Sequence, residues 1–402
     1  MKGEPMAFRH DTSIDRRSVV KGIAGVAALS ALPVGTSLHA TADSAKALNP
    51  RWYGFNLLEY FSTDPDWMKH FPYENNGMFR EDDFRWMRDW GFNWARLPMD
   101  YRFWTDASDL MKIDERKVEP IDRAVRLGER YGVHVNVSLH RAPGECILDG
   151  MNQKLVGIHI VEEPASVYRD QRMLDACIHQ WQFFAKRYKG IPSTQLSFNL
   201  VNEPDDRGAP DEATGRKNYA RVARQAIDTI RVIDSQRVIT SDGYPGGGAP
   251  VKELFDTHIV QSPHDYVPFQ LTHYRVPWAR PMSDQVPTPT WPLKDGEGKI
   301  IASRETKEDR FRPLKELAEL GVPIHFGEMG CGGHTPPDVV YAWFNDTLDL
   351  MKDLKAGWAL WNLRGQFGIV DTGRPGTEFK DFHGHKLDYK LLDLLKSKMM
   401  SS

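Results

Sequence analysis

Short apolar segments alternate with longer amphipathic segments over most of the chain. The short segments are apolar runs of strand length bounded by polar or turn-forming residues, which predicts buried β-strands. Eight such strands are predicted: Trp52–Leu57, Asn93–Leu97, Val133–Leu139, Gln195–Leu200, Val238–Thr240, His258–Gln261, Val322–Phe326 and Gly357–Leu360.

The segments between them have the apolar spacing of helices with one buried face. These predicted helices are Glu81–Trp90, Glu119–Tyr131, Arg172–Tyr188, Asn218–Ile233, Val251–Phe255, Phe311–Leu320, Val339–Leu354 and Leu387–Met399. Three of them end at a glycine just before the next strand, namely Gly91, Gly132 and Gly321, which is typical of a helix C-cap. Strands that alternate with helices imply a parallel sheet, and eight units fit a (β/α)8 barrel better than an open sheet. We expect one α/β domain over residues 43–402.

Composition narrows the class of protein. The chain has 52 basic and 55 acidic residues and a net charge of −3, with no basic block, so a nucleic-acid partner is not expected. Three cysteines do not make a disulfide framework, and their spacing matches no zinc pattern. Twelve tryptophans are many for this length; most should pack in the core, but tryptophan faces also bind flat sugar rings.

The first 42 residues have the order of a secretory signal. Arg16-Arg17 lies in a motif that resembles the twin-arginine export signal, an uncharged stretch runs from Gly22 to Leu38, and Ala40-Thr41-Ala42 offers a small-residue cleavage site. The alternative is a membrane anchor, but this stretch is short, rich in Gly and Ala, and broken by a proline. We expect removal of residues 1–42 and export of the mature chain to the periplasm or medium, with no membrane association afterwards.

Polar and aromatic groups gather where the predicted strands end. Six strands are followed by such groups: Arg96-Leu97-Pro98, His140-Arg141, Asn202-Glu203-Pro204, His264-Asp265-Tyr266, Glu328-Met329-Gly330 and Trp361-Asn362. In a barrel the carboxyl ends of the strands converge on the face that carries the chemistry. No dinucleotide fingerprint or phosphate loop follows the first strand, so no cofactor is expected.

These motifs together resemble glycoside hydrolase family 5, the cellulase-type retaining glycosidases. The resemblance extends from about Trp52 to the C-terminus. It is carried by the strand-end motifs above, with Phe198-Asn199-Leu200-Val201-Asn202-Glu203-Pro204 as the Asn-Glu-Pro signature and Phe326-Gly327-Glu328-Met329-Gly330 as the nucleophile motif. Asp265 and Tyr274-Arg275-Val276 depart from the cellulase pattern, which leaves the substrate open.

The resemblance implies Glu328 as nucleophile and Glu203 as general acid, then base. Acetal hydrolysis needs two such carboxyl groups. Arg96 and Tyr266 are expected to hold Glu328 ionised, and Asn202 to bind the hydroxyl beside the reacting carbon. His140 and His264 would orient neighbours or contact sugar hydroxyls, and Trp361 would form the floor of the sugar site. Trp104, Trp278 and Trp291 are candidate sugar platforms away from the cleavage point.

Two other classes stay open. A metal-dependent barrel hydrolase usually carries His-x-His on an early strand, whereas His383-Gly384-His385 lies beyond the eighth strand, so no metal is expected. A sugar-binding barrel without activity is disfavoured by the presence of both carboxyl groups. The expected partner is a β-glycan polysaccharide or oligosaccharide, cleaved by a monomer in the manner of an endo-β-1,4-glucanase. Mannan, xyloglucan and β-1,3-glucan are the alternative substrates.

Overall fold

Eight parallel strands form one sheet that closes on itself. The computed structural model describes residues 51–63, 78–146, 165–279 and 287–400, so the predicted signal segment lies outside the described residues. The strand order is β11-β12-β1-β2-β5-β6-β7-β8, and parallel bridges from Gln261 to Ile324 and from Asp265 to Met329 bring the β8 and β11 edges together. The bounds are β1 Tyr53–Asn56, β2 Trp94–Asp100, β5 His134–Arg141, β6 Leu196–Asn199, β7 Val238–Asp242, β8 Val260–Ser262, β11 His325–Met329 and β12 Gly357–Leu360. The predicted (β/α)8 barrel is confirmed.

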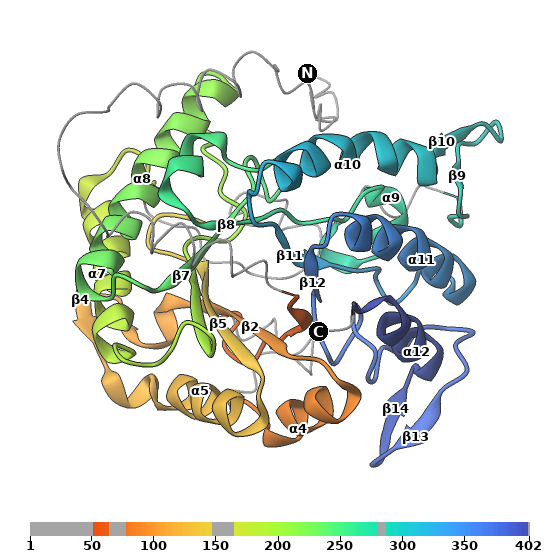
Figure 1. The fold of residues 1–402 in the computed structure, drawn as a ribbon, viewed down its shortest axis with the longest axis horizontal. Helices are drawn as coiled ribbons and strands as arrows, with labels where there is room; N and C mark the ends of the chain where they lie inside the picture. The colour runs from red at the N-terminus through yellow and green to blue at the C-terminus, as the bar shows by residue number, and fades with distance from the viewer. Residues whose placement is uncertain (1–50, 64–77, 147–164, 280–286, 401–402) are drawn as a thin grey trace.

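Helices surround this sheet, as Figure 1 shows. They are α4 Glu81–Trp90, α5 Glu119–Tyr131, α7 Gln171–Arg187, α8 Glu212–Ile233, α9 Phe269–Thr272, α10 Arg304–Glu319, α11 Pro337–Asp353 and α12 Tyr389–Lys398. Helices α8 and α10 begin more than one turn earlier than predicted, because side chains cap their polar first turns: Asp211 caps α8, and a capping box between Ser303 and Thr306 starts α10. The predicted helix Val251–Phe255 is a 3-10 segment, η3 Lys252–Thr257. No helix within the described ranges is long and apolar enough to cross a membrane.

Three antiparallel hairpins within the described ranges were not predicted. They pair β3 Thr105–Asp106 with β4 Asp109–Ile113, β9 Leu293–Lys294 with β10 Ile300–Ala302, and β13 Lys380–Phe382 with β14 His385–Leu387. Most of their residues are exposed or half-buried, so they lack the apolar pattern that identifies a buried strand.

The barrel interior is apolar and aromatic at the amino ends of the strands. There Trp52, Trp94, Val238, Val260 and Ala359 form one buried cluster, with the rings of Trp52 and Trp94 stacked 4.4 Å apart. Because alternate residues of a strand point to the same side, the positions further along these strands also face the interior. Arg96 therefore shares the inward face of β2 with Trp94, and Asp242 shares that of β7 with Val238. His264, four residues after Val260, continues the inward face of β8.

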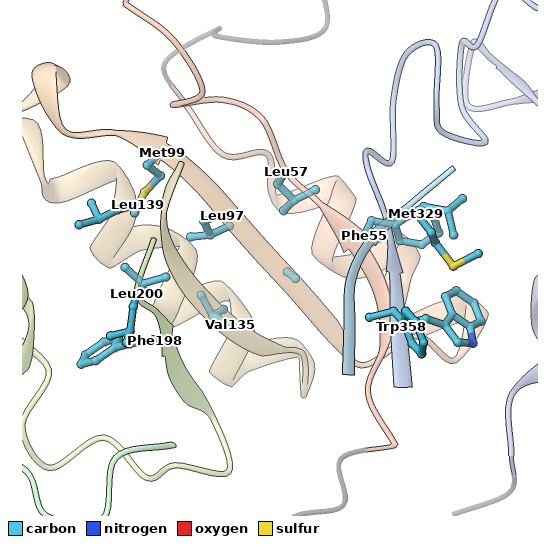
Figure 2. Close-up of a cluster of buried hydrophobic side chains, with 14 of the residues drawn as sticks. Phe55, Leu57, Leu97, Met99, Val135, Leu139, Phe198, Leu200, Met329 and Trp358 are labelled. Carbon is cyan, nitrogen blue, oxygen red and sulfur yellow. The ribbon is translucent and has the colours of Figure 1, made fainter. Parts of the chain in front are cut away.

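Apolar packing between sheet and helices fixes the strands that carry these polar side chains. Figure 2 shows part of this layer, including Phe55, Leu97, Val135 and Phe198, each at most 1 % exposed. A smaller apolar cluster includes Phe61, Trp361 and Phe367. Since Phe61 and Trp361 follow the first and last strands of the barrel, this cluster lies beyond the carboxyl ends.

Candidate active site

The carboxyl ends of the strands bring Glu203 and Glu328 together. Glu203 follows β6, and Glu328 lies within β11. A carboxylate oxygen of each and a ring nitrogen of His264 lie within 4.8 Å of one another. The side chain of Glu328 is 4 % exposed and that of Glu203 is 18 % exposed, so only Glu203 has appreciable contact with solvent.

Glu328 is bound on both carboxylate oxygens. Arg96 Nη1 donates to Oε1 over 2.5 Å, and the Tyr266 hydroxyl donates to Oε2 over 3.1 Å. Burial raises the pKa of Glu328, while the charges of His264 and Arg96 lower it, and burial is the larger effect. Arg96 and Tyr266 thus lie on Glu328 as expected, and the structure adds two further influences on its ionisation, the cost of desolvation and the charge of His264.

Arg96 reaches Glu328 from a fixed position. Its guanidinium is 1 % exposed and donates to the side-chain oxygens of Asn56 over 2.9 Å, Asn199 over 2.8 Å and Asn202 over 2.7 Å. Asn56 in turn donates to the carbonyl of Gly327, the residue before Glu328. The cation is thus held by three amide oxygens and, at 3.4 Å, by the carboxylate of Asp242, while Nη1 keeps one N–H for Glu328.

Glu203 sits in a left-handed turn. Its φ of 43° is rare for a residue with a Cβ and costs of order 1–3 kcal/mol, which such sites offset with surrounding contacts. Its backbone N–H donates to Asp242 Oδ2 over 3.1 Å, and its Oε1 lies 2.8 Å from His264 Nδ1. The turn presents the carboxyl group toward Glu328 instead of along the strand.

Asn202, His140 and Trp361 lie around the two glutamates. Asn202 is fully buried, and its Nδ2 has no hydrogen-bond partner, so a donor remains available. The His140 ring lies 5.3 Å from that of Trp361, and burial, reinforced by the charges of Arg141 and Arg96, holds its pKa well below 6.5. His140 is therefore neutral at ordinary pH.

A family model described as cellulase (glycosyl hydrolase family 5) matches residues 47–366, more than half of the chain and all the strand ends described above. The chain belongs to glycosyl hydrolase family 5. This family 5 enzyme is a glycosidase that hydrolyses O-glycosyl bonds, and its substrate is a polysaccharide.

Known proteins agree with this assignment. The family 5 enzyme is 25 % identical to cellodextrinase A of Ruminococcus flavefaciens over 312 residues, covering 76 % of this chain and 83 % of that protein. It is 24 % identical to endoglucanase C of Acetivibrio thermocellus over 306 residues, covering 71 % and 83 %. A solved glycoside hydrolase structure superposes with a TM-score of 0.76 and 36 % identity, covering 87 % of this chain and 99 % of that one. Endoglucanase Cel5A of Thermotoga maritima shares the fold, with a TM-score of 0.65 and 19 % identity, covering 88 % and 99 %.

The three candidate sugar platforms of the family 5 enzyme have different surroundings. The assignment of Trp104 is wrong: it is 1 % exposed, and its indole N–H donates to buried Gln180, so it is a core residue. Trp291 donates to Asp346 on α11 and belongs to the helix layer. Trp278 is half-buried and packs on the apolar cluster that contains Trp361 and Phe367. Of the three, only Trp278 packs on the cluster that contains Trp361.

We expect Trp278→Ala to raise KM severalfold and to leave kcat within about threefold, because stacking on a sugar contributes equally to the ground and transition states. Steady-state kinetics on a soluble glycan measure both constants. Trp104→Ala is the matched control, since removing a buried tryptophan costs ~3–5 kcal/mol and should lower Tm sharply. A similar fall in Tm for Trp278→Ala would make it a structural residue.

Sequence reasoning missed two residues of the site, Asn56 and Asp242. Both are fully buried and bind Arg96, Asn56 at 2.9 Å and Asp242 at 3.4 Å. They stand at the carboxyl ends of β1 and β7, the strands that end in Asn56 and Asp242. The rule that found the other six ends would have found these as well.

One group of three side chains in the described residues has the spacing to hold a metal ion: Glu203, His264 and Glu328. His264 Nδ1 already hydrogen-bonds to Glu203, and Arg96 occupies Oε1 of Glu328. The charges of Glu328 and Asp242 raise the pKa of His264 to about 10 despite its burial, and a protonated imidazole does not bind metal. The arrangement favours mutual hydrogen bonding over metal binding.

Proposed function

We propose that the enzyme cleaves β-linked glucans in the manner of an endo-β-1,4-glucanase, by double displacement at Glu328 and Glu203. The observation that carries the mechanism is the separation of the two carboxyl groups. Retaining glycosidases place them ~5–5.5 Å apart, and inverting ones ~6.5–9.5 Å apart to admit a water molecule. One oxygen of Glu203 and one of Glu328 lie within 4.8 Å of each other, which is on the retaining side of these two ranges and supports the retaining arrangement.

Glu328 is the nucleophile in this scheme. An oxygen of its carboxylate attacks the anomeric carbon, while the bond from that carbon to the leaving oxygen breaks. Arg96 and Tyr266 bind the carboxylate oxygens and orient them for attack. A water molecule then hydrolyses the glycosyl-enzyme and returns the carboxylate.

Glu203 is the general acid and then the base. Its proton passes to the leaving oxygen in the first step, and its carboxylate takes a proton from water in the second. The free Nδ2 of Asn202 donates to the hydroxyl beside the reacting carbon, a contact that strengthens in the transition state. Trp361 supplies an apolar floor for the sugar ring, and neutral His140 beside it offers ring nitrogens to sugar hydroxyls.

The names of the curated relatives, a cellodextrinase and an endoglucanase, support a β-1,4-glucan as substrate. Purified enzyme tested on cellulose derivatives, mixed-linkage glucan, mannan, xyloglucan and β-1,3-glucan, with product lengths measured, identifies the glycan. NMR of the first product identifies the mechanism: we expect the β-anomer, and an α-anomer would refute double displacement.

Two alternatives give distinct results in the same assays. A sugar-binding barrel without activity would retain affinity for a glycan and release no product. A metal-dependent hydrolase would lose activity with a chelator and regain it with a divalent ion, whereas we expect no change.

We also propose that the protein is exported by the twin-arginine route. Its mature form is expected to begin near Asp43, as N-terminal sequencing of the periplasmic or secreted protein would show. Replacing both Arg16 and Arg17 with lysine should block export, since the pair is the recognised feature of such signals. Unchanged export of that variant would refute the proposal.

A further inference from the structure

The carboxylate of Asp242 lies among the groups that hold both glutamates, although no motif singled it out. Asp242 ends β7 and is fully buried. Its Oδ1 accepts a hydrogen bond from Asn199 Nδ2 over 2.8 Å, and its Oδ2 accepts one from the backbone N–H of Glu203 over 3.1 Å. Oδ2 also lies 3.1 Å from His264 Nε2 and 3.4 Å from Arg96 Nη2.

The four groups within 3.4 Å of this carboxylate are nitrogen donors, and one of them is the guanidinium of Arg96. A neutral side chain would therefore leave donors unmatched in a fully buried place, which is costly. Burial alone would raise the pKa of Asp242, but the charges of His264 and Arg96 lower it to about 2. Asp242 is ionised throughout the range in which enzymes of this kind work.

His264 links Asp242 to the acid/base. Its Nε2 lies at Asp242, while its Nδ1 lies 2.8 Å from Glu203 Oε1 and 3.5 Å from Glu328 Oε2. The ring is wedged between two glycines: a Cβ on Gly247 would come within 2.9 Å of its Cγ, and one on Gly327 within 3.4 Å of its Nε2. The imidazole therefore has little freedom to rotate, and its charge state decides what it presents to Glu203.

We propose that Asp242 is a positioning residue for the acid/base: it fixes the left-handed turn of Glu203 and holds His264 as an imidazolium that donates from Nδ1 to Glu203. This inference rests on the proposed role of Glu203 and adds to it the group that maintains its surroundings.

The carboxylate of Asp242 balances one of the two buried positive charges at the site. Asp242 from β7, Glu328 from β11 and Glu203 after β6 lie at His264, and His140 from β5 interacts with it electrostatically. Arg96 from β2 and Tyr266 beyond β8 bind the same carboxylates. His140 and Tyr266 are neutral, so the cations are Arg96 and His264, and the anions are Asp242 and Glu328 when Glu203 carries its proton. When Glu328 bonds to the sugar, it loses its charge and Glu203 gives its proton to the leaving oxygen, so the sum stays at zero. Without Asp242, one positive charge is left over in a buried site or His264 loses its proton.

Asp242→Asn tests the proposal, because it keeps the shape and removes the charge. We expect kcat on the glycan to fall about 10²-fold or more with KM within about threefold. A 2,4-dinitrophenyl β-glycoside needs little acid assistance. The rate of glycosyl-enzyme formation from this substrate should therefore fall by a factor at least about tenfold smaller than the fall in kcat on the glycan. The control is Asp388→Asn, which removes another buried carboxylate. Asp388 pairs with Arg374 at 3.2 Å and is not one of the residues around the two glutamates. This control variant should lower Tm without changing the ratio of the rates on the glycan and on the aryl glycoside.

NMR of 15N-labelled histidine gives a readout that does not depend on activity, with His264→Gln used for assignment. In the wild-type enzyme both ring nitrogens of His264 should stay protonated at pH 8, and in Asp242→Asn the midpoint should fall by about one unit or more. An equal loss of rate on both substrates in Asp242→Asn overturns the inference. A wild-type His264 that is neutral at pH 7 also overturns it, and this result stands even if Asp242→Asn folds poorly. Wild-type enzyme inactive on every β-glycan and aryl β-glycoside would instead refute the proposed function, while the histidine titration would still decide the charge of His264.

Discussion

Glu328→Ala is expected to abolish hydrolysis of every substrate, with kcat reduced roughly 10⁴-fold or more, as when other enzymes lose a covalent nucleophile. The reason is geometric as well as chemical. Glu328 is the carboxyl group on which Arg96 and Tyr266 converge, and its distance from Glu203 suits the retaining arrangement, in which this carboxylate itself attacks the sugar. A substrate with a good leaving group should not restore activity, because that group relieves only the need for acid.

The loss must be separated from misfolding. Removing Glu328 leaves Arg96 as a buried cation with one partner fewer, so a fall in Tm is also expected. Glu328→Gln keeps the shape and is the better variant for kinetics. Circular dichroism and glycan affinity, measured together with rates, identify a folded enzyme that binds without cleaving. Substantial residual hydrolysis by a folded Glu328→Gln would place the nucleophile elsewhere.

The order of strands and helices along the chain was predictable because each strand is a short apolar run. A run of that length between two helices is too short to be a helix itself. All eight predicted strands are present, and the largest shift, at β11, moves the strand only toward its catalytic end. The exposed hairpin of β3 and β4 could not be predicted in this way, since its register comes from backbone pairing and its side chains face solvent.

The site was predictable as a set of strand ends but not as a set of contacts. Period-two alternation makes Arg96 an inward residue once Trp94 is known to fill the barrel, and the same reasoning extends to Asp242. The sequence does not show the left-handed turn at Glu203, because such a conformation is unfavourable locally and is stabilised only by distant partners such as Asp242. Trp104 was misassigned because proximity to a strand end does not tell whether a ring faces the site or the helices.

The pKa of Glu328 shows another limit of sequence reasoning. Neighbouring charges can be inferred from motifs, but burial depends on the loops and side chains that enclose the site. Here burial raises the pKa of Glu328. The charges of His264 and Arg96 lower it, so the ionised form of the nucleophile depends on both cations. Their charge is in turn held by Asn56, Asn199 and Asp242, none of which a catalytic motif names as a reacting group.

Glu203→Ala is expected to separate the two chemical steps. Without the acid, kcat/KM on a glycan should fall about 10²–10⁴-fold, the usual contribution of a positioned general acid. A 2,4-dinitrophenyl β-glycoside should still form the glycosyl-enzyme at a rate within about tenfold of wild type, because its leaving group departs without a proton. Hydrolysis of that intermediate then becomes slow, since no base activates water.

Azide makes this prediction specific to one carboxyl group. The shortened side chain leaves space beside the anomeric carbon, and azide needs no base, so it should attack the glycosyl-enzyme, raise turnover and give a β-glycosyl azide that NMR identifies. Wild-type enzyme with azide is the control and should show no acceleration, because Glu203 excludes the anion. The side on which azide attacks follows from the mechanism: attack on the glycosyl-enzyme restores the β configuration, whereas attack on the substrate directly, as in a Glu328 variant that retains its acid, gives the α azide. An α azide from Glu203→Ala would therefore reverse the roles of the two glutamates, and the absence of a β azide from Glu203→Ala would count against a glycosyl-enzyme.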